Sequence, residues 1–402
     1  MISKAHEKLA IDGGMPVRKT YLQYGRQYID QKDIDAVVEV LQSDYLTCGP
    51  KIVEMEHRLE DITSAKHALA VSNGTAALHL ACLSAGLRHG DEVIVSPMTF
   101  AASANCVLYC GATPVFADID DQTWNIAPEK VEQCVTERTK AIIVVDYMGQ
   151  AASLHALEAI CNKYHLLLME DASHALGTKF DGRPVGSIAD MTTFSFHPVK
   201  TVTSGEGGAL TTNNSELFEK ARIYRTHGIT RDPAKLIRAD NGNWYYEQQL
   251  LGFNYRITDI QAALCMSQLD KLELFSRRRK EITALYNQEF SSMDEIVLPV
   301  EIPESDTVRH LYVIRLNLDR ITTDRKTVFK ALQAENIGVN VHYIPVYRLP
   351  YYEQLGYPKG LCPNAEAHYE SCITLPLYYS MTDDDAADVV CAIKKVIQHY
   401  SR

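Results

Sequence analysis

Short apolar runs alternate with helix-like segments through the first half of the chain. These runs are residues 68–71, 92–95, 114–117, 141–145 and 166–169. Between them, segments such as 76–86 and 154–164 repeat apolar residues at helical spacing. Strands joined in this way pair in parallel, with helices on both faces of the sheet. The pattern predicts an α/β fold, a large domain with a mostly parallel central sheet flanked by helices, whose binding site lies at the carboxyl ends of the strands.

Weaker patterns flank this repeat. Residues 1 to about 25 form an irregular lead-in. A helix follows, with apolar residues at helical spacing, namely Ile34, Val37, Val38 and Leu41. Further along, strands at 192–196 and 209–212 enclose a polar segment, a helix occupies 216–225, and residues 230–250 form a loop.

The last third of the chain predicts a smaller C-terminal α+β domain. One long amphipathic helix at 258–290 links it to the rest. Its other elements are a strand at 311–316, a helix at 325–335, a strand at 338–343 and a closing helix at 383–400. Since 402 residues exceed the size of one typical core, we expect two domains, 1–257 and 258–402.

Composition narrows the possible partners. The formal net charge of −11 argues against general binding of nucleic acid or an anionic membrane, but a local site for a small phosphorylated ligand is compatible with it. The ten cysteines lack the spacing of a disulfide scaffold, and Cys106 and Cys110 read as packed core, so no metal site is expected. No apolar signal or membrane-spanning run occurs, which predicts a cytoplasmic protein.

One lysine lies in a segment rich in hydroxyls and glycines. Lys200 follows the strand that ends at Phe194 and Phe196, and glycines begin at Gly205. Burial at a strand end lowers the pKa of a lysine, and a neutral amine is what Schiff-base chemistry requires. The alternative is an ordinary surface lysine in a loop.

Two other strand exits carry candidate ligand groups. Residues 72–75 put small polar residues and a glycine at the start of a helix, where free N–H groups favour a phosphate. The same residues also serve as a plain helix cap. Phe100 presents a flat apolar face at the next exit, although core packing is the commoner role of phenylalanine.

A carboxylate pair follows the strand at 166–169. Side chains alternate along a strand, so Glu170 and Asp171 face opposite ways and only one enters the cleft. An acid there could hold a protonated ring nitrogen, or it could cap a helix, and Asp146 on the neighbouring strand is a rival. A phosphate site, a flat aromatic, an acid and a lysine together are what pyridoxal phosphate requires.

The sequence also resembles a known family. Its motifs are Ser72-Asn-Gly-Thr-Ala-Ala-Leu78, Glu170-Asp-Ala-Ser-His174, Ser195-Phe-His-Pro-Val-Lys200, Gly205-Glu-Gly-Gly208 and Gly252-Phe-Asn-Tyr-Arg256. They are similar to the signatures of the DegT-type nucleotide-sugar aminotransferases, in order and along nearly the whole chain. These are fold-type I pyridoxal phosphate enzymes, usually homodimers with sites at the subunit interface.

The resemblance implies a role for each matching position. Lys200 would bind the cofactor covalently, Asp171 would pair with its ring nitrogen, and Phe100 would stack on the ring. The phosphate would be bound by Gly74, Thr75 and Ser195, with His174 beside the ring and Asn254 reaching the phosphate from the partner subunit.

Finer features resemble the branch of this family that acts in pseudaminic acid biosynthesis. They are His197, residues 341–347 and residues 24–27. This likeness implies amine transfer from L-glutamate, leaving 2-oxoglutarate, to a UDP-linked 4-keto-6-deoxy N-acetyl sugar. Other nucleotide-linked keto sugars, such as a dTDP-4-keto-6-deoxyhexose, remain alternatives.

Further residues are candidates for binding the sugar nucleotide. They are Arg26 and Arg256 for the phosphates, and His342 and Tyr343 for the sugar, with packing in the smaller domain as the alternative for the last two. His197 could contact phosphate or sugar, or pack beside the lysine. A sugar dehydratase of the family would have histidine in place of Lys200, and a regulator that only binds cofactor would not react with glutamate.

Overall fold

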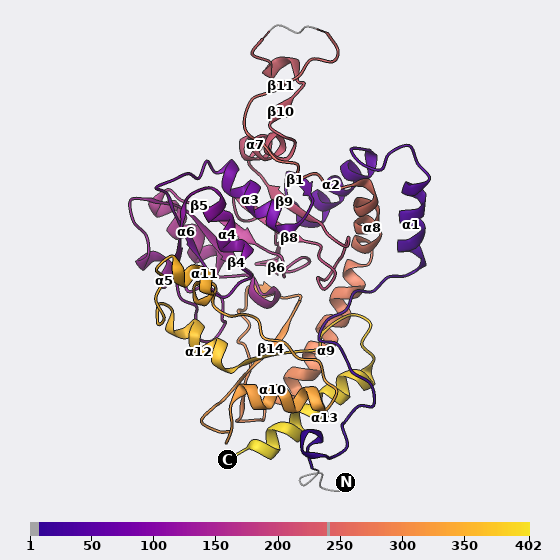
Figure 1. The fold of residues 1–402 in the computed structure, drawn as a ribbon, viewed down its shortest axis with the longest axis vertical. Coiled ribbons are helices and arrows are strands. Elements are labelled where there is room, and N and C mark those ends of the chain that lie inside the picture. Colours follow the sequence, from indigo (N-terminus) through magenta and orange to yellow (C-terminus); the bar gives the residue numbers. More distant parts are fainter. Residues whose placement is uncertain (1–7, 239–241) are drawn as a thin grey trace.

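A seven-stranded sheet forms the centre of the computed structural model, which describes residues 8–238 and 242–402 (Figure 1). The strand order is β1-β9-β8-β5-β4-β2-β3, and β9 alone runs antiparallel to its neighbours in this sheet. The strands are β1 (His67–Val71), β2 (Glu92–Val95), β3 (Thr113–Phe116), β4 (Thr139–Val145), β5 (Leu167–Asp171), β8 (Met191–Ser195) and β9 (Gly208–Thr212). The predicted α/β fold is confirmed.

Helices cover both faces of this sheet. Successive side chains of each strand point to opposite faces, so both faces are apolar and each is buried in its own core. Leu69 and Val71 of β1 enter one core, while Ala68 and Ala70 enter the other. The first core is covered by α3 (Gly74–Ser84), α4 (Ala102–Tyr109) and α7 (Ser215–Arg225). The second is covered by α2 (Pro50–Thr63), α5 (Pro128–Gln133), α6 (Leu154–Tyr164) and α8 (Asp259–Leu269).

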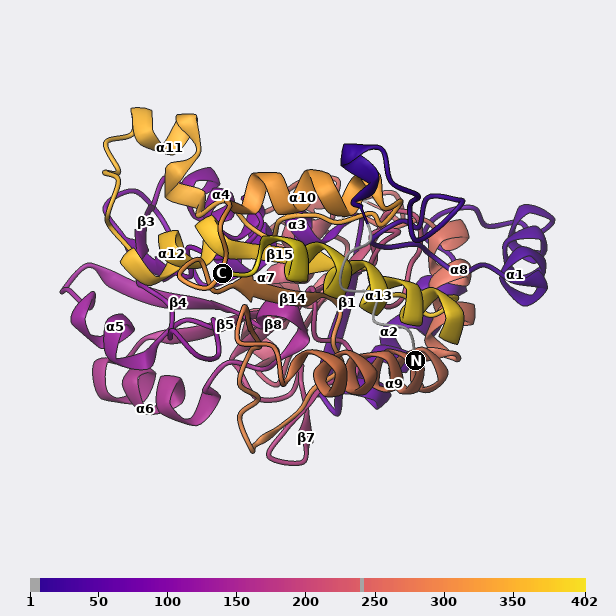
Figure 2. The same cartoon turned by 90° about the horizontal axis from the view of Figure 1, so that it is seen from below.

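A second layer follows α9 (Leu272–Phe290) and has its own apolar core. Its three-stranded sheet has the order β12-β14-β15, formed by β12 (Ile296–Val297), β14 (Tyr312–Leu316) and β15 (Cys372–Leu375). Two further helices, α10 (Arg325–Ala334) and α13 (Asp383–Tyr400), pack on it, and α13 lies between α10 and α9 (Figure 2).

The N-terminal lead-in packs against this C-terminal layer. Leu9 and Leu22 belong to its core, next to the short helix η1 (Ala10–Asp12). The buried carboxylate of Glu335 accepts hydrogen bonds from the backbone N–H groups of Ala10 and Val17, both at 2.9 Å. The first residues of the chain therefore pack against its last third. The domain boundary near residue 257 stays a prediction.

The predicted helix at 258–290 is wrong in one respect, because it is two helices. The apolar spacing continues through the break, but α8 ends at Leu269 and α9 begins at Leu272. Lys271 between them forms ion pairs with Asp30 at 2.6 Å and with the fully buried Asp33 at 2.8 Å. These contacts tie the junction between the two helices to the N-terminal end of α1 (Gln31–Leu41). The break is therefore explained by a contact with a distant segment and not by the local sequence.

Other predicted elements differ in detail. Residues 338–343 form no strand but an extended segment with an isolated bridge between Asn340 and Thr374. The expected loop at 230–250 includes η3 (Pro233–Lys235) and β11 (Glu247–Gln248), which pairs with β10 (Ile229–Thr230) in an arm that leaves the body of the molecule (Figure 1). Residues 239–241 of that loop lie outside the described residues.

The remaining elements are short. They are η2 (Tyr147–Gly149), β6 (Lys179–Phe180), β7 (Arg183–Pro184), β13 (Ser305–Asp306), η4 (Val346–Arg348), α11 (Pro350–Gln354) and α12 (Pro363–Ser371). Within residues 8–238 and 242–402, no helix is both long enough and apolar enough to cross a membrane.

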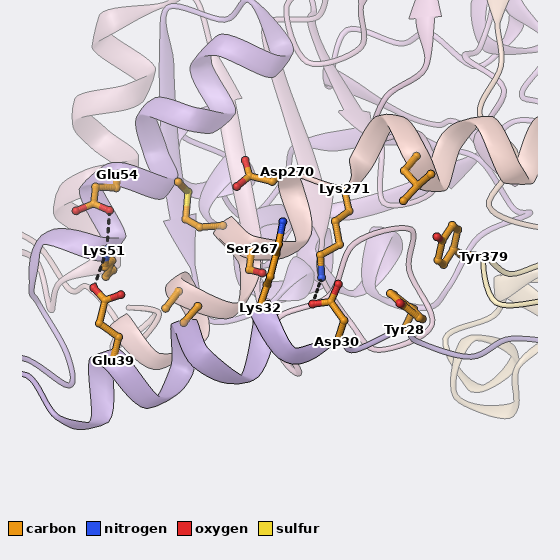
Figure 3. A pocket seen from close by; sticks show the side chains of 14 residues that line it. Tyr28, Asp30, Lys32, Glu39, Lys51, Glu54, Ser267, Asp270, Lys271 and Tyr379 are labelled. Atoms are coloured by element: carbon orange, nitrogen blue, oxygen red, sulfur yellow. Dashed lines mark hydrogen bonds and ion pairs between the residues drawn. The ribbon is translucent and has the colours of Figure 1, made fainter.

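A groove of about 460 Å³ lies between α1 and the helices α2, α8 and α9 (Figure 3). Charged side chains line it, and several of them pair with each other. Lys51 contacts Glu54 at 3.1 Å, and Lys271 contacts Asp30. The groove is therefore best explained as the polar contact surface between α1 and the body of the protein.

Candidate active site

A cavity of about 1020 Å³ opens where the carboxyl ends of the parallel strands meet. Residues at or just after the ends of β1, β2, β5 and β8 line it, together with the extended segment 340–343. The predicted site residues among its lining are Gly74, Thr75, Phe100, Asp171, His174, Ser195, His197, Lys200, His342 and Tyr343. The four strand exits thus converge on one space.

Lys200 lies in the turn that follows β8. Its backbone N–H donates a hydrogen bond to His197 O at 2.9 Å, and Phe194 and Phe196 before it are both fully buried. The two buried phenylalanines therefore anchor the turn to the hydrophobic core. Burial lowers the pKa of the Lys200 amine to about 8, although the negative charge of Asp171 opposes the shift. About one amine in ten is then neutral at pH 7, far more than for an exposed lysine.

Asp171 enters the cavity, and Glu170 does not. Met169 belongs to the core under α3 and α4, so Asp171, two residues on, shares that face of the sheet. Its Oδ2 accepts a hydrogen bond from Ser103 Oγ, and its Oδ1 accepts one from Ser173 Oγ, both at 2.6 Å. Glu170 faces the other core and accepts a hydrogen bond from Thr192 Oγ1 at 2.8 Å.

Asp146 does not compete with Asp171. It is fully buried, is not part of the cavity lining, and accepts a hydrogen bond from the Ala152 N–H at 3.0 Å. Burial, reinforced by the neighbouring Glu170, raises the pKa of Asp146 well above its usual range. A protonated carboxyl in the sheet interior is unsuited to holding a cationic ring nitrogen.

The residues expected to bind a phosphate, here called the cradle, meet where α3 begins. Asn73 caps the helix by accepting a hydrogen bond from the Ala76 N–H at 2.8 Å. Gly74 packs so closely on Ser195 that a Cβ at position 74 would lie 2.9 Å from Ser195 Cβ. The cavity lining at this point combines backbone N–H groups of the first helical turn with the hydroxyls of Thr75 and Ser195. Cap and cradle therefore coexist.

An aromatic group and a histidine complete the centre of the cavity. Phe100 is 65% exposed although it lines the cavity, so its ring is free to cover a flat ligand. His174 is buried, and burial together with the charge of Lys200 lowers its pKa well below the usual range. Its Nε2 lies 3.1 Å from the Tyr343 hydroxyl, and its Nδ1 has no hydrogen-bond partner among the described residues.

His342 is largely committed to packing. Its Nδ1 lies 2.8 Å from Thr374 Oγ1, and burial lowers its pKa to about 3. His342 therefore contributes a neutral ring to the cavity wall. Tyr343 also lines the cavity, and burial raises the pKa of its hydroxyl, which stays protonated.

Three predicted residues do not line the cavity. Arg26 and Asn254 are exposed, Arg256 is half-buried, and all three lie outside the lining. Among the described residues, no arginine contributes to this cavity at all. His197, which is exposed, does contribute. Lys200 is thus the one lysine or arginine that lines the cavity within the described part of the chain, and two carboxylates or a diphosphate would require more.

Sequence reasoning missed several lining residues. They are Tyr24, Asn73, Thr99, Tyr109, Ser173, Glu206, Tyr255 and Asn340. Asn73, Ser173 and Tyr255 belong to motifs that were recognised, so proximity in sequence could have indicated them. Tyr109 and Asn340 come from a helix end and a distant extended segment, and no local pattern marks them.

Comparison with known proteins identifies the family. A sequence model of the DegT/DnrJ/EryC1/StrS aminotransferase family matches residues 27–394. The chain belongs to this family. One relative is the spore coat polysaccharide biosynthesis protein SpsC of Bacillus subtilis. It is 41% identical over 383 residues, which cover 95% of this chain and 98% of SpsC.

Two solved structures support the same assignment. The putative sugar aminotransferase Spr1654 from Streptococcus pneumoniae in its PLP form is 32% identical, with a TM-score of 0.88 over 94% of this chain and 99% of that chain. Helicobacter pylori PseC, an aminotransferase involved in the biosynthesis of pseudoaminic acid, is 32% identical, with a TM-score of 0.87 over 95% of this chain and 100% of that chain. This member of the DegT/DnrJ/EryC1/StrS family is a pyridoxal phosphate-dependent sugar aminotransferase.

The cavity fits that cofactor. The Nδ1 of His174 lacks a partner among the described residues, and burial makes the Lys200 amine more neutral. An unpaired buried nitrogen and a partly neutral lysine suit a cofactor that brings polar groups and an aldehyde.

We expect Gly74→Val to weaken cofactor binding about a hundredfold or more. The new side chain would begin 2.9 Å from Ser195 Cβ and would push apart the start of α3 and the end of β8. Fluorescence titration of the cofactor-free protein with pyridoxal phosphate measures the effect. Gly90→Val is the matched control, since a Cβ there meets nothing within 4 Å, although its positive φ costs some stability. Equal affinities of Gly74→Val and wild type would refute the cradle.

The pKa of Lys200 predicts a pH dependence. Only the neutral amine attacks the aldehyde, so the rate of recombination of cofactor-free protein with pyridoxal phosphate should rise between pH 7 and 8 and level off above the pKa of about 8. Stopped-flow absorbance at several pH values tests this. A rate that still rises about tenfold per pH unit up to pH 9.5 would mean that Lys200 has the pKa of an ordinary lysine.

Proposed function

We propose that the protein transfers the amino group of L-glutamate to the 4-keto carbon of a UDP-linked 4-keto-6-deoxy N-acetyl sugar, a reaction of the pseudaminic acid type. The observation that carries the proposal is the convergence of Lys200, Asp171 and the Gly74–Ser195 cradle on one cavity. The likeness to PseC along the whole chain supports the pathway, and the resemblance of residues 24–27, 195–200 and 341–347 to that branch supports the sugar.

Lys200 carries the proton transfers in this proposal. When bound, pyridoxal phosphate supplies an electrophilic carbon for the amine and a ring that accepts the electron pair released when a C–H bond breaks. Once glutamate has displaced it, Lys200 Nζ removes the proton from the glutamate Cα. In the second half of the cycle it returns a proton to C4 of the sugar. An amine with a pKa of about 8 suits both roles near neutral pH.

The neighbouring side chains hold the reacting groups in place. Asp171 would face the ring nitrogen, and Phe100 would cover one face of the ring, because both residues line the cavity. His174 stays neutral beside it, and its contact with Tyr343 links the cofactor position to the segment 340–343. Tyr343 and His342 would offer hydrogen bonds to the hydroxyls of the sugar, because both residues line the cavity.

The substrate is tested with a small panel of nucleotide sugars. We would incubate the protein with glutamate and UDP- or dTDP-linked 4-keto-6-deoxy sugars, with and without an N-acetyl group, and detect the aminated product by mass. The UDP-linked N-acetyl sugar should give the highest kcat/KM. A higher value for a dTDP-linked hexose would replace the proposed substrate while keeping the aminotransferase.

We also propose that the protein acts as a homodimer in the cytoplasm. Several observations support a second copy. The cavity of one chain lacks arginine within the described residues, and Asn254 is exposed outside its own cavity. At the edge of the molecule, Ile34, Val38 and Leu41 of α1 are 48%, 41% and 55% exposed (Figure 1). An apolar helix face of this kind is typical of a subunit contact. The ten free cysteines fit a reducing compartment.

Mixed dimers test whether Asn254 serves the partner's site. A Lys200→Ala subunit paired with an Asn254→Ala subunit would rebuild one intact site, because the intact lysine and the intact asparagine come together. Random mixing should then recover about a quarter of the wild-type activity. If Asn254 acts within its own chain, both sites of the mixed dimer are damaged and activity stays at the level of the parents. That result would contradict a shared site.

A further inference from the structure

The carboxylate of Asp171 is held by hydroxyl groups on both of its oxygens. Oδ1 accepts two hydrogen bonds from Ser173, one from Oγ at 2.6 Å and one from the backbone N–H at 3.1 Å. Oδ2 accepts one from Ser103 Oγ at 2.6 Å. A carboxylate oxygen accepts about two hydrogen bonds, so Oδ1 is saturated and Oδ2 keeps one acceptor position.

Ser103 is itself oriented by a second hydroxyl. It is fully buried in the first turn of α4, and Thr99, which is 3% exposed, lies in the turn before that helix. The two oxygens are 2.6 Å apart. Ser103 has a single proton, and its contact with Asp171 is much shorter than its 3.4 Å contact with Phe100 O. Ser103 therefore donates to Asp171, and Thr99 donates to Ser103.

The geometry points to Ser103, oriented by Thr99, as a positioning residue that fixes the Asp171 carboxylate so that the free lone pair of Oδ2 receives the ring nitrogen of the cofactor. This inference rests on the proposed role of Asp171. Ser173 comes from the same turn as Asp171, but Ser103 reaches it from α4, 68 residues away. Within the described parts of the chain, Ser103 is therefore the residue whose hydrogen bond ties the carboxylate to a separate element, and Thr99 orients Ser103.

The hydroxyl chain also links two parts of the cofactor site. Thr99 and Ser103 flank Phe100, which lines the cavity. The turn that presents the stacking ring is thus the turn that orients the acid. A shift of α4 relative to β5 would therefore move the stacking ring of Phe100 and the Ser103 hydroxyl together, relative to Asp171.

The test is a double-mutant cycle on the binding of pyridoxal phosphate to the cofactor-free protein. Ser103→Ala should weaken affinity about tenfold and lower kcat about tenfold, because a charge-assisted hydrogen bond to Asp171 is lost. The KM for glutamate should stay unchanged. In an Asp171→Ala background, the same Ser103→Ala change should have no further effect on affinity, since its partner is gone.

Thr99 provides a second, milder probe. Thr99→Val keeps the shape but removes the hydroxyl, and should weaken the affinity for pyridoxal phosphate about threefold. Thr99→Ser keeps the hydroxyl and should retain wild-type affinity. The Val effect should vanish in a Ser103→Ala background. Ser84→Ala, the same change at another buried helical serine, is the matched control and should leave affinity unchanged.

The outcomes separate the possible explanations. If Ser103→Ala weakens affinity equally with and without Asp171, the serine is merely structural and the inference is wrong. Wild-type affinity in Ser103→Ala also overturns it. If instead Asp171→Ala itself binds the cofactor and turns over normally, the proposed role of Asp171 has failed, and that failure is visible before the cycle is completed. Urea midpoints of all variants identify any loss of folding.

Discussion

A Lys200→Ala variant should lose amine transfer by at least about a thousandfold and should no longer show the visible absorbance of the lysine-bound cofactor. Both losses have the same cause, since the Nζ amine forms the covalent link and also moves the proton. The fold should persist, because the fully buried Phe194 and Phe196 anchor the strand end before Lys200. Absorbance spectra and single-turnover reactions with glutamate measure the two effects.

Lys179→Ala is the matched control for this prediction. Lys179 is exposed on β6, away from the cavity lining, and its removal should change neither spectrum nor rate. A Lys200→Ala protein that transaminates at the wild-type rate would show that another group performs the proton transfers.

An Asp171→Asn variant should lower kcat by about a hundredfold to a thousandfold. Asparagine keeps the shape, but it carries no charge to hold the ring nitrogen protonated, and its single amide oxygen can replace only one of the two oxygens that accept from Ser103 and Ser173. The electron pair released at the reacting carbon then has a poorer acceptor. The loss should appear in kcat and in the rate of the glutamate half-reaction, with little change in the urea midpoint.

Asp146→Asn supplies the control on the neighbouring strand. Its raised pKa means that Asp146 is already protonated in the folded protein, so the neutral amide should leave kcat unchanged. The raised pKa means that the folded protein holds this proton more tightly than the unfolded chain does, so the free energy of unfolding of the wild type should fall as pH rises. Asp146→Asn has no proton to lose at this position and should be more stable than the wild type at high pH. If Asp146→Asn reduced kcat more than Asp171→Asn did, the two acids would have been assigned in reverse.

The position of the site followed from the sequence because parallel strands carry their exits to one edge of the sheet. The apolar runs before Gly74, Phe100 and Asp171 located those exits without any knowledge of strand order. Alternation alone left the choice between Glu170 and Asp171 open, and only the family resemblance favoured Asp171. Met169 settles it by entering the core beneath α3 and α4.

Contacts between distant segments were not predictable. The break between α8 and α9 depends on Lys271 pairing with Asp33, whose sequence neighbours give no hint of that contact. Ser103 lies in an apolar helical stretch, and its partner Asp171 is on another strand. Arg256 belongs to a family motif yet lies outside the cavity of its own chain, so its contact with the nucleotide phosphates stays a prediction.

Isotope transfer tests the central claim most directly. The wild-type protein, loaded with pyridoxal phosphate, would be incubated with ¹⁵N-glutamate and the UDP-linked 4-keto-6-deoxy N-acetyl sugar. We predict one ¹⁵N atom in the sugar product, at the carbon that carried the keto group, and an equal amount of 2-oxoglutarate. Formation of 2-oxoglutarate without label in any nucleotide sugar, or a dehydrated sugar with no nitrogen gained, would contradict the account.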